Sequence, residues 1–235
     1  MSSHTPNLVI YNLGCGTRAS AFCTNVDWSI HLRLRRWGLA RLAGSRRDAI
    51  EALPESIVVH DLRRSIPAAT ASVDVVYHSH LLEHIDRSSV PAFMGEVLRV
   101  LRPGGIHRIV VPDLERLATR YLDGFGAKGH DERVAGMIEQ MVRREAAGSS
   151  RQSTPRRFLE NLFLGDARRR GETHQWMYDR HSLAQLLIRS GFVRPQQVDH
   201  KESAIPGWTR LDLDQNSDGS PYKSLSLYME AWKPD

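Results

Sequence analysis

The feature that most constrains this chain is an apolar run that ends in two glycines one residue apart, LVIYNLGCG at residues 8–16. A strand that runs into Gly-x-Gly carries no side chains at its carboxyl end, so its backbone N–H groups can approach a ligand. In an open α/β sheet that edge is where cofactors bind. The third glycine of the dinucleotide fingerprint is absent, because Arg18 and Ala19 stand where it would fall. The run therefore predicts a nucleotide-type site that lacks the full dinucleotide motif.

A second short apolar stretch, residues 24–28, carries the carboxylate of Asp27. An Asp at the end of the next strand can accept hydrogen bonds from both hydroxyls of a ribose. Asp27 follows the glycines more closely than the roughly 20 residues of the dinucleotide fingerprint, so we expect the intervening helix to be reduced to a turn. The alternative interpretation is a solvated loop carboxylate.

The rest of the chain alternates strand and helix patterns, which favours a parallel, doubly wound α/β sheet. Further strands are predicted at residues 57–61, 73–78, 106–111, 193–198 and 225–232, and helices at residues 88–101, 114–121 and 182–190. We expect residues 102–105, RPGG, to end the helix before the next strand begins. Periodicity loosens at residues 124–171, which reads as an insertion or lid within a single domain spanning residues 1–235.

The chain has 235 residues and a formal net charge of +5, carried mostly by arginines within residues 33–47 and 143–170. A basic face would attract anionic substrates, whereas solvated helix faces explain the same charge without a ligand. No basic platform interleaved with aromatic residues is present, so no nucleic-acid partner is expected. Cys15 and Cys23 have no metal-ligand spacing, and no apolar run approaches membrane-spanning length. These features predict a soluble, reduced, cytoplasmic protein with no membrane span.

Six ordered segments together resemble a known family. They are residues 12–16 (NLGCG), 25–27 (NVD), 60–62 (HDL), 79–84 (SHLLEH), 99–105 (RVLRPGG) and 111–114 (VPDL). In this order they make the chain similar to class I S-adenosylmethionine-dependent methyltransferases over nearly its whole length. Residues 174–179 (HQWMYD), followed by Ser182 and Leu183, resemble a bacterial type 11-like subgroup that is associated with glycan or secondary-metabolite pathways.

The resemblance implies a Rossmann-like, doubly wound, seven-stranded sheet, mostly parallel with an antiparallel last strand, and S-adenosyl-L-methionine as the cofactor. The glycines would let the backbone approach the methionine part, Asp27 would hold the ribose, and Asp61 with Leu62 would read the adenine edge. The full set of implied cofactor-binding residues is Asn12, Gly14, Cys15, Gly16, Asp27, Trp28, Asp61, Leu62, Ser79 and His80. The short first crossover and the basic stretch at residues 33–47 depart from the family pattern.

Methyl transfer from a sulfonium depends mostly on alignment, worth roughly 7–11 kcal/mol when the geometry is ideal. A hydroxyl nucleophile must also lose its proton, and histidine is the natural base near neutral pH. His174 and His80 are the catalytic candidates, and Asp113, Trp176 and Tyr178 are the candidates for positioning the substrate. We therefore expect O-methylation of a small-molecule or glycan acceptor in a bacterial biosynthetic pathway. The oligomeric state stays open, with a homodimer among the options.

The motif at residues 80–84, HLLEH, also matches the inverted zinc-peptidase pattern H-x-x-E-H, in which two helical histidines would share a zinc. A metal-dependent methyltransferase is a middle alternative, since some O-methyltransferases bind a divalent metal through a related E-x-x-E-H pattern. We adopt the third interpretation, in which Glu83 and His84 cap and pack a helix and no metal is bound. A non-catalytic binding module would need a damaged cofactor site, and the motifs are intact.

Overall fold

The computed structural model describes residues 8–38, 54–123 and 174–235. The insertion or lid expected at residues 124–171 lies outside these ranges, so it stays a prediction. No helix in the described part of the chain is long and apolar enough to cross a membrane.

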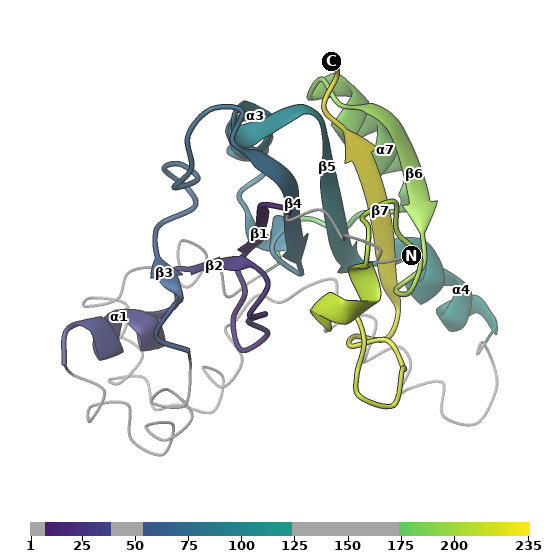
Figure 1. Ribbon diagram of the computed structural model, residues 1–235. Coiled ribbons are helices and arrows are strands. Elements are labelled where there is room, and N and C mark those ends of the chain that lie inside the picture. The colour runs from purple at the N-terminus through teal and green to yellow at the C-terminus, as the bar shows by residue number, and fades with distance from the viewer. Residues whose placement is uncertain (1–7, 39–53, 124–173) are drawn as a thin grey trace, which may run out of the picture.

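A seven-stranded sheet forms the centre of the described structure, in the order β3-β2-β1-β4-β5-β7-β6 (Figure 1). The strands are β1 (Ile10–Leu13), β2 (Thr24–Asp27), β3 (Val58–Val59), β4 (Val73–Ser79), β5 (Leu101–Pro112), β6 (Val193–Val198) and β7 (Ser226–Trp232). The pairings among β1 to β5 are parallel, and β7 runs antiparallel to both β5 and β6. The predicted fold class is thereby confirmed. The strand order reverses between β1 and β4, which is where such sheets bind ligands.

The connection from β1 to β2 contains turns and no helix, as expected from its length. Gly14 and Gly16 both have left-handed backbone conformations, with φ of 65° and 51°. Such values suit glycine, which has no Cβ. The N–H of Gly14 donates to the carbonyl of Val26 at 2.7 Å, which ties this glycine loop to β2. A short helix, α1 (Ile30–Arg36), then begins after Ser29, whose hydroxyl accepts from the N–H of Leu32.

The predicted break between helix α3 (Val90–Val100) and β5 is wrong. Leu101 leaves the helix in an extended conformation and already pairs with Val73 of β4. Gly104 adopts φ of 69°, and its N–H donates to the carbonyl of Lys233. A Cβ at Gly105 would lie only 2.8 Å from the Arg102 carbonyl oxygen. The Pro-Gly-Gly sequence therefore makes a tight bend inside the strand, because glycine permits both the backbone angle and the close approach.

Two apolar layers cover the sheet. On one face α3 and α7 (Arg180–Arg189) contribute to the larger core, which includes Met94, Val97, Leu183 and Leu187, all fully buried. The other layer joins sheet residues to the segment from 199 to 222, which contains the 3-10 helix η4 (Trp208–Leu211). Side chains alternate across a strand, so the successive residues of β4 divide between the two layers. The remaining helices among residues 8–38, 54–123 and 174–235 are η2 (Leu82–His84) and α4 (Leu114–Asp123).

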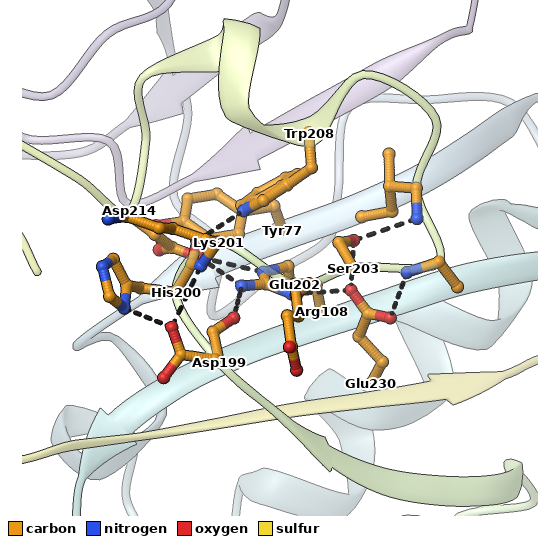
Figure 2. A network of polar contacts seen from close by, with 12 residues as sticks. Tyr77, Arg108, Asp199, His200, Lys201, Glu202, Ser203, Trp208, Asp214 and Glu230 are labelled. Atoms are coloured by element: carbon orange, nitrogen blue, oxygen red, sulfur yellow. Dashed lines mark hydrogen bonds and ion pairs between the residues drawn. The ribbon is translucent and has the colours of Figure 1, made fainter. Parts of the chain in front are cut away.

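A buried ionic network fastens the segment from 199 to 222 to the sheet (Figure 2). Arg108 on β5 is fully buried, and its guanidinium donates to Asp214 at 2.9 Å and to Glu230 of β7 at 2.7 Å. It also donates to the carbonyls of Glu202 and Asp199, each at 2.9 Å. Because all its nitrogens bind acceptors inside the protein, Arg108 acts as the structural centre of this region.

Two buried histidines face each other between β4 and β5. The Nε2 atoms of His78 and His107 lie 3.0 Å apart, and both residues have no exposed surface. Their rings pack against Phe93 of α3 and against Phe192. Burial lowers the pKa of His78 to about 4 and that of His107 well below its ordinary value. Both imidazoles are therefore neutral at neutral pH.

We expect this histidine pair to make the fold sensitive to mild acid. The His78 imidazole has a pKa of about 4 in the folded chain and 6.5 in the unfolded chain. Between pH 6.5 and pH 4 the unfolded chain therefore binds more protons, and the free energy of unfolding falls as the pH falls. Between pH 7 and pH 5 His78 alone should cost about 2 kcal/mol of unfolding free energy. Urea unfolding at both pH values should show a smaller loss for the double variant His78→Leu/His107→Leu than for wild type. The exposed His181→Ala variant should keep the wild-type loss, and an unchanged loss in the double variant would contradict the account.

Candidate active site

The glycine loop and Asp27 meet at the carboxyl ends of β1 and β2. Asp27 is buried, with 7% of its surface exposed, so the interpretation as a solvated loop carboxylate is wrong. Its Oδ2 accepts from the N–H of Gly16 at 2.7 Å, and its Oδ1 accepts from the N–H of Ser29 at 2.6 Å. Each carboxylate oxygen has a second lone pair, so Asp27 can still accept a hydrogen bond from a ligand hydroxyl.

Asn12 and Cys15 support the loop from within. The Asn12 amide donates to the carbonyl of Arg18 at 2.9 Å and to Asn25 Oδ1 at 3.0 Å. Burial, followed by the nearby charge of Asp27, raises the pKa of the Cys15 thiol to about 12. A thiol of this kind is unreactive at neutral pH. In the described structure both side chains therefore hold the shape of the loop.

The two glycines differ in the space around them. A Cβ at Gly14 would lie 3.0 Å from Leu81 Cδ1, so the loop touches the chain just after β4. A Cβ at Gly16 would meet no atom within 4 Å. The loop thus packs on one side and leaves its second glycine open on the other. This arrangement fits a cofactor that binds against backbone N–H groups.

Asp61 lies two residues beyond the end of β3, where the adenine contact was expected. Its carboxylate accepts from Arg63 Nε and from Arg63 Nη2, each at 2.8 Å. These contacts with Arg63 lower the pKa of Asp61 despite partial burial. Leu62 packs against the larger core, and the partly exposed Trp28 ring lies under the Arg33 guanidinium at 4.8 Å. The carboxylate is thus ionised and oriented, with a flexible arginine as its present partner.

His80 follows Ser79, the last residue of β4, and has a left-handed backbone with φ of 51°. Its N–H donates to the carbonyl of Val110 at 2.8 Å. Its Nε2 lies 3.0 Å from Ser226 Oγ, and its Nδ1 lies 3.2 Å from Glu83 Oε1. Both ring nitrogens therefore have protein partners, which suits a residue that orients others.

Glu83 is the most unusual residue of the site, because its carboxylate has no exposed surface and faces histidines. Besides the contact with His80, Oε1 lies 3.9 Å from His84 Nε2, and the His84 ring packs against the His174 ring with centroids 4.7 Å apart. Burial would raise the pKa of Glu83, but the hydrogen bond and charge of His80 and the charge of His84 outweigh it and lower the pKa to about 2. The structure thus assembles a histidine–carboxylate cluster of His80, Glu83, His84 and His174.

The alternative zinc-peptidase arrangement of the H-x-x-E-H motif, with both histidines on one helical face, does not form. His80 lies outside η2 in a left-handed conformation, so it does not share a helical face with His84. The adopted interpretation, that Glu83 caps and packs the helix, is right for packing, because the side chain is buried, and wrong for capping, because η2 has no side-chain cap at its start. Instead, the N–H groups of Gln175 and Trp176 donate to the Glu83 carbonyl at 2.6 and 3.4 Å, and this pairing brings His174 to the cluster.

The three residues expected to position the substrate occupy different environments. Asp113 Oδ1 accepts from the N–H groups of Glu115 and Arg116 at the start of α4, and burial raises its pKa. Tyr178 is buried in the larger core, and burial raises its pKa to about 12. Trp176 has 41% of its surface exposed and carries the Arg87 guanidinium 3.9 Å from its ring centroid. Trp176 is therefore the most accessible of the three, while Asp113 and Tyr178 support the local structure.

A family model described as a methyltransferase domain matches residues 12–109, which run from the end of β1 into β5. Residues 12–109 therefore belong to a methyltransferase domain. Its sheet order and antiparallel β7 are those expected of class I, and S-adenosylmethionine is its cofactor. A search of curated protein sequences finds no match.

Several solved structures are similar to this methyltransferase domain. The chain is 18% identical to an S-adenosylmethionine-dependent methyltransferase from Methanosarcina mazei, with a TM-score of 0.48 and coverage of 97% of this chain and 92% of that one. For an S-adenosylmethionine-dependent methyltransferase from Mesorhizobium loti the identity is 19%, the TM-score 0.45 and the coverage 96% and 91%. For the CurJ carbon methyltransferase the identity is 11% and the TM-score 0.45, and 99% of this chain spans 50% of that one. The sheet order and strand directions themselves define the fold.

Proposed function

We propose that this methyltransferase methylates a hydroxyl group of a small-molecule or glycan acceptor. The observation that carries the proposal is the histidine–carboxylate cluster beside the glycine loop. Leu81, which would touch a Cβ at Gly14, lies between His80 and Glu83 in the sequence and so links the two parts of the site. A hydroxyl acceptor must lose a proton during transfer, and an imidazole beside a buried carboxylate is suited to that task.

S-adenosylmethionine, when bound, supplies a sulfonium methyl group that bonds to the acceptor oxygen as its bond to sulfur breaks, so S-adenosylhomocysteine and the hydroxyl proton are released. The N–H groups around Gly14 and Gly16 would hold the methionine part, and Asp27 would accept from the ribose hydroxyls. Asp61 would turn from Arg63 toward the adenine edge beside Leu62. Ser79 and His80 would lie next to the transferred group.

His174 is the catalytic residue in this proposal. It reaches the cluster on the segment that also carries the exposed Trp176, whose ring can stack on a sugar or an aromatic acceptor. The acceptor hydroxyl would lie at His174 and lose its proton there. His80 is a positioning residue, because Ser226 and Glu83 hold its two ring nitrogens.

Replacing Asp27 by alanine should weaken cofactor binding. The loss of hydrogen bonds to a charged group costs about 1.5–3 kcal/mol, which is roughly a 10- to 150-fold higher Kd. Calorimetric titration with S-adenosylhomocysteine measures this change. Asp218→Ala is the matched control, because Asp218 also accepts a backbone N–H in a turn but lies in an exposed loop. Equal Kd values for Asp27→Ala and wild type would show that the ribose contact is wrongly assigned.

The acceptor chemistry can be tested with a labelled methyl group. The chain is incubated with methyl-labelled S-adenosylmethionine and a panel of sugars, phenols, amines and carboxylates, and the methylated atom is identified by mass spectrometry and NMR. We expect labelled methyl ethers from hydroxyl acceptors. Label found on nitrogen or carbon alone would refute O-methylation while leaving the methyltransferase assignment intact.

A further inference from the structure

We infer that Glu83, His84 and His174 form a binding site for one divalent transition-metal cation of the zinc class. The inference deepens the proposed function. Only the role of the cation in methyl transfer rests on that proposed function. Its structural basis is separate, because it depends on the ligand atoms and their surroundings and on no feature of the cofactor site.

The three side chains already converge. One carboxylate oxygen of Glu83 and one ring nitrogen each of His84 and His174 lie within 4.8 Å of one another. Zinc–ligand distances of about 2.0–2.2 Å place neighbouring ligand atoms roughly 3–4 Å apart. Side-chain rotations that bring the three ligand atoms about 1 Å closer together would therefore allow them to bind one ion. The backbone bonds from Gln175 and Trp176 to the Glu83 carbonyl hold the two contributing segments together.

The surroundings of Glu83 independently indicate that its carboxylate can bind a cation. Its side chain has no exposed surface, and apart from the contact with His80 its carboxylate oxygens have no hydrogen-bond partner among the described residues. Its Oε1 lies 3.2 Å from His80 Nδ1 and 3.9 Å from His84 Nε2. A carboxylate removed from water is costly unless it is paired or coordinates a metal. A divalent cation at the centre of the cluster would supply this partner.

The ligand types indicate which cations fit. Two imidazoles and one carboxylate suit zinc, cobalt, iron(II) and manganese, whereas magnesium and calcium favour oxygen ligands. Three protein ligands leave a coordination position for an oxygen of another molecule. His80 would orient the Glu83 carboxylate from behind, as partners of metal ligands usually do. With a cation bound, His174 would act as its ligand, and the cation would lower the pKa of an acceptor oxygen beside it so that the proton passes to solvent.

Cobalt(II) is a suitable probe, because its visible absorption reports nitrogen and oxygen ligation. The full chain, without a histidine tag and treated with chelator, is titrated with cobalt(II) in the absence of cofactor and acceptor, and bound metal is counted by mass spectrometry after dialysis. We expect one equivalent with a saturable visible band. His84→Ala and His174→Ala should each lower the affinity on the order of 100-fold or more, since even the loss of a residue behind a ligand costs 10- to 100-fold. Circular dichroism checks that both variants fold.

His181→Ala is the matched control, because His181 is exposed on α7 and lies outside the cluster. It should bind cobalt like wild type. Absent or sub-stoichiometric binding to wild type would overturn the inference, as would equal affinity of a folded His174→Ala variant. A chain that methylates hydroxyls but binds no cobalt overturns this inference alone. One that binds cobalt as described but methylates no hydroxyl overturns the proposed function alone.

Discussion

The variant His174→Ala is expected to lose about 100-fold or more in turnover while keeping its affinity for S-adenosylhomocysteine. The size follows from general acid–base catalysis, which contributes typically 100- to 10,000-fold. The affinity should persist because His174 contacts the cluster after β4, whereas the glycine loop and Asp27 lie at the ends of β1 and β2. Steady-state kinetics should therefore show a lower kcat with an unchanged KM for the cofactor.

The control for His174→Ala is again His181→Ala, which removes an exposed histidine from α7 and should leave kcat unchanged. A thermal unfolding curve for each variant separates loss of chemistry from loss of fold. Normal turnover by a folded His174→Ala variant would contradict the assignment of proton removal to this cluster. A raised KM for the cofactor with an unchanged kcat would contradict it too, because it would place His174 in cofactor binding.

The second large effect concerns stability. Arg108→Met is expected to lower the free energy of unfolding by about 3–5 kcal/mol, because it leaves the Asp214 and Glu230 carboxylates buried without their cation. Burial already raises the pKa of Asp214, and the charge of Arg108 opposes that rise. Removing Arg108 should also loosen the segment from 199 to 222, which its guanidinium holds through two carbonyls. Urea unfolding at neutral pH measures the change.

The chain offers a matched control in Arg102→Met. The Arg102–Asp74 and Arg108–Glu230 pairs both have nitrogen–oxygen distances of 2.7 Å, but the Arg102 side chain is 49% exposed and that of Arg108 is fully buried. An exposed ion pair contributes about 0–1 kcal/mol. The two variants should therefore differ by several-fold in their loss of stability. Equal losses would show that burial does not set the strength of the Arg108 network.

Much of the sheet could be predicted from the sequence, because strand signals are local. The run into Gly14 and Gly16 predicted both the end of β1 and the open backbone beside it, and the closeness of Asp27 predicted the short crossover. The bend inside β5 was not predictable in the same way. Pro-Gly-Gly usually ends an element, and here only the pairing of Leu101 with Val73 shows that the strand has already begun.

The site was predictable where it follows strand ends and obscure where it depends on long-range contacts. His80 and His174 were both proposed from local motifs, yet nothing local shows that Glu83 is buried or that the segment after His174 pairs with its carbonyl. Ser226 gave no signal, since its contact with His80 exists only once β7 has joined the sheet. The layer around Trp208 lacks a helical or strand period and so could not be assigned from sequence.

The central claim, that the cofactor binds at the carboxyl ends of β1, β2 and β4, is tested most directly by amide NMR of the nitrogen-labelled chain titrated with S-adenosylhomocysteine. We predict saturable one-site shifts that are largest at Gly14, Gly16, Asp27, Asp61 and His80. Residues of β6 and α7, which lie at the far edge of the sheet, should shift little. The absence of saturable shifts, or shifts concentrated at β6 and α7, would contradict the account.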